Sequence, residues 1–252
     1  MRCVGETEWV DRIAREAASA PGIRPRIGAI VATADLRLGR RVREVLEAHA
    51  QASPLFRGIR DGAAFDPTAP RRMTDALALY ADAAFREGFR VLGEMGLSYD
   101  AYHYHFQTPH SCVISLEPSR TSDRAGPSRH APRRGTLCRP ARGDLRGVVE
   151  GARRFASCEN VVVKLGGFAM PWNGFGFEAR ERPPTSDGRY YAHAIECFGA
   201  ERCLFESNFP VDRLSVSYDV LWNAFKKMVA GASEDEKDAL FRGTATRVYR
   251  LD

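Results

Sequence analysis

Short apolar runs recur along the chain, separated by polar or glycine-containing segments. Runs of this length that are rich in β-branched and aromatic residues are typical of buried strands. NVVVKLGGF, for example, carries three consecutive valines and is bounded by polar and glycine residues. The predicted strands are residues 26–34, 56–65, 97–106, 160–168 and 201–210.

Between these runs, apolar residues instead return at intervals of three and four, which predicts amphipathic helices. In the first helix this spacing places Trp9 and Ile13 on one face, which we expect to be buried. Ser233 with Glu236 has the spacing of a capping box, which predicts the start of the last helix. The predicted helices are residues 6–19, the segment after Asp35, 72–88, 215–230 and 233–249.

Strands that alternate with helices indicate βαβ units and a parallel sheet. We therefore predict an α/β fold, with residues 1–252 as a single domain organised as an incomplete TIM-like (β/α)8 barrel. A chain of 252 residues is long enough for one such barrel. The first strand is not followed by the G-x-G-x-x-G pattern, which argues against a dinucleotide-binding sheet. In barrels of this kind the active site lies at the carboxyl ends of the strands.

The middle of the chain breaks this alternation. Residues 107–154 contain no Phe, Trp or Tyr, and repeated prolines interrupt any helical pattern. Such a composition buries too little apolar area to offset the entropy lost on ordering. We therefore predict a disordered or irregular segment at 109–145. One hypothesis is that this segment derives from a frame-shifted reading of an ancestral barrel.

The strand at 201–210 ends in Glu206-Ser207-Asn208. Residues two apart on a strand face the same way, so we expect Glu206 and Asn208 to point together toward the mouth of the barrel. A carboxylate there could act in general acid–base catalysis. The alternative is that these residues merely end a strand.

Two cationic residues lie on predicted strands. Lys164 interrupts the apolar run VVVKLGG, and a lysine is costly to bury without a partner. It could bind a substrate carboxylate or polarise a carbonyl, or it could reach the rim with no chemical role. Arg60 could hold an anionic group through paired hydrogen bonds, and a solvated surface role is equally open. Gly166 and Gly167 would allow another segment to approach closely.

In combination, these segments resemble the amidohydrolase family, in its branch of amidohydrolase-2-type metal-dependent hydrolases and sugar lactonases. ERCLFESNFP is similar to the last barrel strand of that family, and FRGIRDGAAFD, YHYHFQ and NVVVKLGGFAMP match earlier segments. SYDVLWNAFKKM and ALFRGTATRVYRL look like its closing helices. The resemblance implies a hydrolase of a lactone, ester or amide bond in a small polar or carboxylated molecule. It also implies that this chain is N-terminally truncated and lacks the first barrel strand.

The resemblance also assigns individual residues. YHYHFQ resembles the fourth strand, which implies that His105 and Gln107 point toward the mouth. Metal ligation by His105 and plain packing stay open beside a catalytic or substrate-contacting role. Trp172 could form part of an aromatic wall over a ring-shaped substrate. The predicted catalytic residues are Glu206, Asn208 and His105, and the predicted substrate-binding residues are Lys164, Arg60, Gln107 and Trp172.

The wider family uses a divalent metal, commonly zinc, which activates water beside the bond to be cleaved. Asn208 stands where the family has an aspartate, and an amide neither takes a proton nor binds a metal strongly. We therefore predict no metal ligands and no cofactor, and we expect the activity of this chain to be impaired. The rival interpretation is a non-catalytic barrel remnant or small-molecule-binding protein.

Other classes of protein find little support in the sequence. No apolar run approaches the roughly 18 residues that cross a bilayer, and MRCVGE lacks an apolar signal core. We therefore expect a cytoplasmic protein. The arginine-rich middle has no interleaved aromatics for base stacking, so nucleic acid is not an expected partner. The predicted partner is a small-molecule substrate, and a homo-oligomer stays open.

Overall fold

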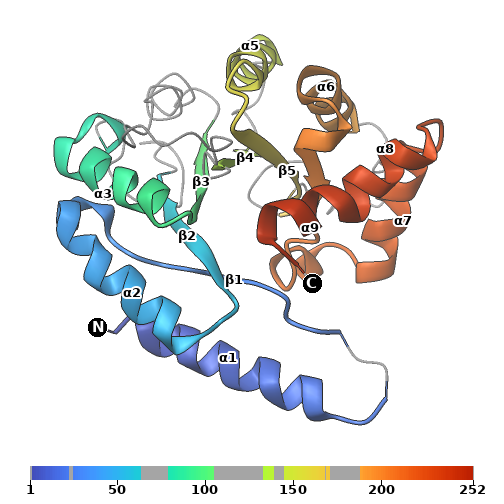
Figure 1. Cartoon of the computed structure of the whole chain (residues 1–252). Coiled ribbons are helices and arrows are strands. Elements are labelled where there is room, and N and C mark those ends of the chain that lie inside the picture. The colour runs from blue at the N-terminus through green and yellow to red at the C-terminus, as the bar shows by residue number, and fades with distance from the viewer. Residues whose placement is uncertain are drawn as a thin grey trace.

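A computed structural model describes residues 2–22, 25–63, 79–104, 133–138, 145–167, 169–170 and 188–251 (Figure 1). Six strands form one sheet in which every neighbouring pair is parallel and the spatial order follows the sequence. The strands are β1 Ile30–Ala32, β2 Phe56–Gly62, β3 Ser98–Tyr104, β4 Arg133–Cys138, β5 Val161–Leu165 and β6 Cys203–Phe205. This arrangement confirms the predicted α/β class. Among the described strands, β1 pairs with β2 alone and β6 with β5 alone, so the sheet stays open between its two edges.

Helices cover the outer side of this curved sheet (Figure 1). The α-helices are α1 Val4–Ser19, α2 Val42–Ala52, α3 Ala83–Glu94, α5 Leu145–Ala156, α6 Gly188–Phe198, α7 Tyr218–Met228, α8 Glu234–Asp238 and α9 Thr244–Tyr249. The helices that contribute to the core, α2, α3, α5, α6 and α7, bury the apolar side chains of their amphipathic faces against the strands. A π-helical turn, Ala239–Gly243, joins α8 to α9. None of the helices in the described ranges is long and apolar enough to cross a membrane.

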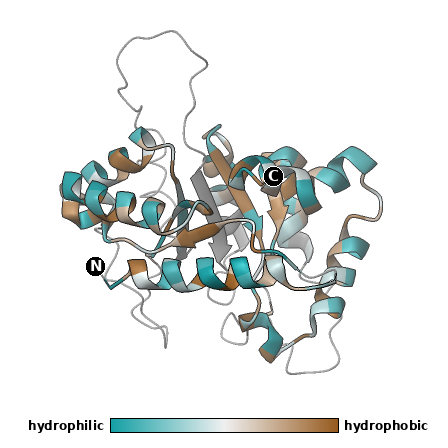
Figure 2. Cartoon of the chain, turned by 60° about the horizontal axis from the view of Figure 1, so that its bottom comes forward, coloured by the Kyte–Doolittle hydropathy of each residue, from teal (hydrophilic) through white to brown (hydrophobic). Residues whose placement is uncertain are grey.

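The core between the sheet and the helices falls into two clusters. One joins β1, β2 and β3 to α2 and α3 around Leu46, Ile59 and Phe85. The other joins β5 and β6 to α5, α6 and α7, where the Phe205 and Phe225 rings stack with centroids 4.4 Å apart. Among the central strands drawn in colour, hydrophobic positions are frequent, whereas the peripheral helices alternate between hydrophilic and hydrophobic positions (Figure 2).

The opposite face of β5 and β6 is also covered. Val162 and Leu204 pack there against Val248 of α9. Alternate residues of a strand point to the same face, so Lys164 lies on the same face of β5 as Val162, which is the face that α9 contacts. The end of α9 therefore closes one side of the concave face that carries the candidate site.

Seven residues of the segment 109–145, which we predicted to be disordered or irregular, lie in regular elements, because β4 occupies six of them and α5 begins at Leu145. Arg133–Cys138 forms β4, which is paired with β3 on one side and with β5 on the other. Composition could not reveal this strand, because its stability comes from hydrogen bonds to two neighbours that the sequence does not place beside it. The remaining parts, 109–132 and 139–144, lie outside the described residues.

Two helix predictions need correction. The helix predicted over 72–88 instead begins at Ala83 and runs to Glu94, because Asp82 is extended and caps α3 by accepting a hydrogen bond from the Phe85 N–H at 2.7 Å. Residues 72–78 lie outside the described residues. In α1 the apolar face is not the buried one, and Trp9 remains 54% exposed. The buried face instead carries polar groups with partners in α2, such as Thr7 Oγ1, which lies 2.8 Å from His49 Nδ1. The Ser233–Glu236 capping box is confirmed.

Candidate functional site

Four charged side chains, three on strands and one directly after a fourth strand, meet on the concave face of the sheet. Arg60 lies on β2 and Asp100 on β3, and the two are register partners in the parallel ladder. Lys164 lies near the end of β5, and Glu206 directly follows β6. Strand alternation and register therefore bring these groups together although they are far apart in the sequence.

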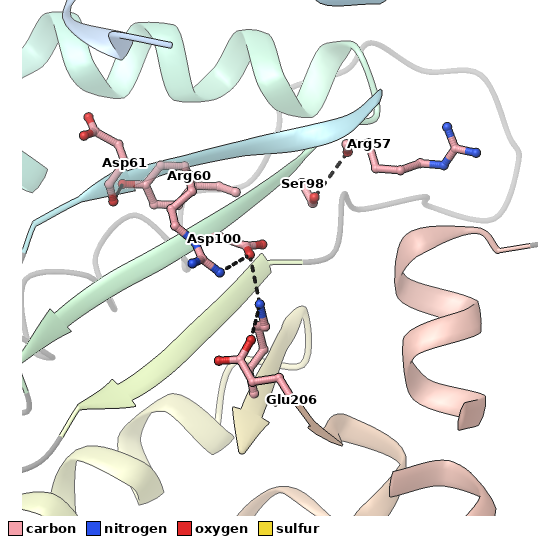
Figure 3. A network of polar contacts seen from close by, with 8 residues as sticks. Arg57, Arg60, Asp61, Ser98, Asp100 and Glu206 are labelled. Atoms are coloured by element: carbon pink, nitrogen blue, oxygen red, sulfur yellow. Dashed lines mark hydrogen bonds and ion pairs between the residues drawn. The ribbon is translucent and has the colours of Figure 1, made fainter. Parts of the chain in front are cut away.

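These side chains form a row of alternating charge, of which Figure 3 labels Arg60, Asp100 and Glu206. The Arg60 Nη2 donates to Asp100 Oδ2 at 3.0 Å, and the Lys164 Nζ donates to the same oxygen at 3.4 Å. The Lys164 Nζ also lies 2.5 Å from Glu206 Oε2. Lys164 thus joins two carboxylates, Asp100 on β3 and Glu206 directly after β6.

Burial differs along the row and indicates which groups a substrate could reach. The side chains of Asp100 and Lys164 are 2% and 8% exposed, whereas those of Glu206 and Arg60 are 19% and 44% exposed. Asp100 and Lys164 are therefore the more enclosed pair, and Glu206 and Arg60 are the more open to a bound molecule.

The two carboxylates keep Lys164 protonated. Burial acts to lower the pKa of Lys164, but Glu206 and Asp100 outweigh that effect and hold the pKa above the usual value for lysine. Burial likewise acts to lower the pKa of Arg60, and the same carboxylates raise it. Both cations therefore stay charged, and the site combines two fixed positive charges with two carboxylates.

A cavity of about 760 Å³ lies against this row of charges. Its volume is in the range of small-molecule pockets. Val31 and Ala32 of β1 both line it, as do Leu204 and Phe205 of β6, although consecutive strand residues point to opposite faces. The main chain of the two edge strands, β1 and β6, therefore lines the cavity. The side of the cavity next to α9 includes Tyr249.

Gly166 allows Glu206 to take its position. A Cβ at residue 166 would lie 2.0 Å from Glu206 Cγ and 2.8 Å from the Glu206 carbonyl oxygen. No side chain other than hydrogen fits there without displacing Glu206. The close approach that the glycine pair predicts is thus an approach of the Glu206 segment itself.

Asn208 lies in a different environment from Glu206. β6 ends at Phe205 and Asn208 has a φ of 51°, so the strand alternation that we expected to align the two side chains does not extend to residue 208. The Asn208 Nδ2 donates to Asp212 Oδ1 at 2.6 Å. Asn208 is not among the residues that line the cavity described above.

Asp212, which the sequence did not single out, ties two loops together. It is fully buried, and its second oxygen accepts a hydrogen bond from the Ala169 N–H at 3.4 Å. Burial raises the pKa of Asp212, and the hydrogen bonds from Asn208 and Ala169 act in the opposite direction. The carboxylate therefore links the loop after β5 to the loop after β6.

Asp100 is the other functional residue missed by the sequence reasoning. Its signal was a carboxylate in the middle of a predicted strand, where aspartate is disfavoured. Its partner Lys164 is 64 positions away, so no local pattern connects them. Three predicted site residues, His105, Gln107 and Trp172, lie outside the described residues.

The described residues do not fit a divalent metal. They contain no group of three His, Cys, Asp or Glu side chains that could hold one. A catalytic zinc needs about three protein ligands. The two carboxylates that converge, Asp100 and Glu206, already share the ammonium of Lys164.

The chain is similar to known proteins over most of its length. Residues 125–251 match a family profile described as Amidohydrolase. Uncharacterized protein y4mH of Sinorhizobium fredii is 31% identical over 258 residues, which cover 98% of this chain and 75% of that protein. An L-fucono-1,5-lactonase of Burkholderia multivorans is 32% identical over 104 residues, which cover 39% of this chain and 33% of the lactonase.

The fold also has a close counterpart among solved structures. An amidohydrolase from Burkholderia multivorans with bound zinc has a TM-score of 0.76 and 25% identity, and the match covers 98% of this chain and 80% of that chain. The family profile spans both Lys164 and Glu206. The profile therefore includes β5, which carries Lys164, and β6, which Glu206 directly follows, whereas Arg60 and Asp100 precede it.

Proposed function

The chain belongs to the amidohydrolase family and is a hydrolase of that type, and on this basis we propose that it cleaves a lactone, ester or amide bond in a small polar, carboxylated molecule. The proposed site is the cavity beside Lys164 and Glu206. The observation that carries the proposal is the buried Lys164 ammonium held 2.5 Å from Glu206 at the wall of that cavity.

Glu206 is the proposed general base. Its side chain is the more exposed of the two carboxylates, and Lys164 fixes one of its oxygens. A positioned carboxylate can take a proton from water as the water attacks a carbonyl carbon. Gly166 supports this role, because it lets Glu206 lie close to the end of β5.

Lys164 is proposed to stabilise the oxygen on which negative charge develops. An ammonium has three donors, and contacts to Asp100 and Glu206 use two of them. The third could donate to the substrate carbonyl oxygen. A fixed donor in a site sheltered from water stabilises such charge more effectively than the same group in water.

Arg60 is proposed to bind a carboxylate of the substrate. Only its Nη2 contacts Asp100, and the side chain is 44% exposed at the cavity. A guanidinium carries five donors, so enough remain for a second carboxylate. This supports an anionic substrate over an uncharged one.

The remaining predicted residues complete the proposal. By the family resemblance, His105 is proposed to act as acid or base and Gln107 to contact the substrate. Trp172 is proposed to cover a ring-shaped substrate. Asn208 is proposed to act through Asp212, which positions the loop after β6.

A panel of lactones, esters and amides, each with and without a carboxylate, tests the proposal. We expect turnover of carboxylated members, a loss of about 10²–10⁴-fold in kcat for Glu206→Gln, and a raised KM for Arg60→Gln. Glu201→Gln, on an exposed residue, is the matched control and should leave both constants unchanged. Equal turnover by wild type and Glu206→Gln would refute the role of Glu206.

The second candidate is a small-molecule-binding protein without catalysis. The observation that favours it is Asn208, whose amide cannot take a proton and is engaged by Asp212. The two candidates differ in one outcome. Binding of a carboxylated lactone that depends on Arg60, without turnover of any panel member, would support the binding protein.

A further inference from the structure

One ammonium stands between two carboxylates at the centre of the candidate site. Asp100 Oδ2 and Glu206 Oε2 both lie within 3.4 Å of the Lys164 Nζ. Carboxylate oxygens that converge on one point at such distances are also the donors that a divalent cation uses.

We propose that Lys164 occupies the position that a divalent cation would take between Asp100 and Glu206, so that the side chain both supplies the positive charge of the site and closes it to metal. The inference deepens the proposed function, since it rests on this cavity being the active site. It predicts that removing the ammonium creates a metal site at the same place.

The charges of the described row support this inference. Arg60 and Lys164 together balance Asp100 and Glu206. A divalent cation placed among them would leave an excess of positive charge beside an ammonium that is only 8% exposed. Repulsion between like charges is strong where water is largely excluded.

The geometry leaves Lys164 little freedom to make room. Its neighbours Val163 and Leu165 are 1% exposed and packed in the core, which fixes the β5 main chain. Its two carboxylate partners also hold the pKa of Lys164 above the usual value. The side chain therefore stays positively charged near neutral pH and keeps its place between the carboxylates.

The carboxylates would remain in place without Lys164. Asp100 keeps its hydrogen bond from Arg60, and Glu206 keeps the close packing of its main chain on Gly166. Metal–oxygen distances of about 2.0–2.6 Å are similar to or shorter than the present contacts. A cation could therefore bridge the two groups after a small contraction.

The test uses the full chain and Mn²⁺ or Zn²⁺ alone as the probe, without substrate. Wild type, Lys164→Ala, Lys164→Arg and the double variant Lys164→Ala/Glu206→Gln are treated with chelator, loaded, desalted and assayed for bound metal. Calorimetric titration gives the affinities. We expect Lys164→Ala to gain up to one equivalent, bound at least tenfold more tightly than by wild type. Lys164→Arg and the double variant should not gain it.

Two outcomes would overturn the inference. One is a folded Lys164→Ala protein that binds no more metal than wild type. The other is wild type that holds one equivalent which Glu206→Gln abolishes, because metal and ammonium would then share the site. This second comparison needs no change at Lys164, so it decides the matter even if Lys164→Ala does not fold.

The metal measurement is separate from catalysis. A chain that hydrolyses no panel member can still gain metal in Lys164→Ala, which would leave the inference standing and the proposed function refuted. If the chain hydrolyses panel members but its Lys164→Ala variant binds no metal, the proposed function stands and the inference about Lys164 fails.

Discussion

Gly166 is the position where a single methyl group tests the site most directly. In Gly166→Ala the new Cβ would lie 2.0 Å from Glu206 Cγ, against 3.4–4 Å for an ordinary contact, so Glu206 must move by about 1.4 Å. The carbonyl oxygen of Glu206, 2.8 Å away, restricts that movement because it belongs to the main chain. Overpacking of this kind costs about 1–3 kcal/mol of folding free energy.

The displacement should affect activity more than stability. A misplacement of about 1 Å in a reacting group can reduce the rate about 10²-fold. We therefore expect Gly166→Ala to lose about two orders of magnitude in kcat on whichever substrate the panel identifies. Urea unfolding measures the change in stability, and steady-state kinetics on the same preparation measures the change in rate.

Gly93→Ala is the matched control. Gly93 lies in α3, and a Cβ there would meet nothing within 4 Å. Replacing a helical glycine by alanine should stabilise the chain by about 0.5–1 kcal/mol and leave the kinetics unchanged. If Gly166→Ala were as stable and active as wild type, the packing of Glu206 on β5 would not position it, and the reasoning would fail.

Three further predictions concern the scaffold. Phe225→Ala removes a fully buried ring and should lower the free energy of unfolding by about 3–5 kcal/mol, whereas Val220→Ala, at a half-exposed position, should change it by less than about 0.5 kcal/mol in urea titrations. Burial lowers the pKa of His49 below 6.5, so the unfolded chain takes up the proton first and stability should fall as the pH drops through 6.5; an equal fall in His49→Gln would contradict this. Asp212→Ala leaves the Asn208 amide without its acceptor and should cost about 1–3 kcal/mol, while unchanged stability would show that water replaces the carboxylate.

Local signals in the sequence were enough to predict several elements. The three valines before Lys164 predict a buried strand, and β5 is buried on both faces. The spacing of Ser233 and Glu236 predicts a capping box, which the structure contains. Both signals act over a few neighbouring residues, so they remain readable without knowledge of the rest of the fold. The alternation of such strands with helices likewise predicts the parallel α/β class.

Other features were decided only by contacts between distant segments. Arg133–Cys138 becomes a strand because β3 and β5 supply hydrogen bonds on both sides, whatever its own propensity. The buried face of α1 follows its partners in α2 and not its apolar stripe. Asp100 joins the site because its strand lies between those of Arg60 and Lys164. The energies of strand pairing and of burial come from residues that are neighbours in space. Those neighbours cannot be identified from the sequence until the order of the strands in the sheet is known.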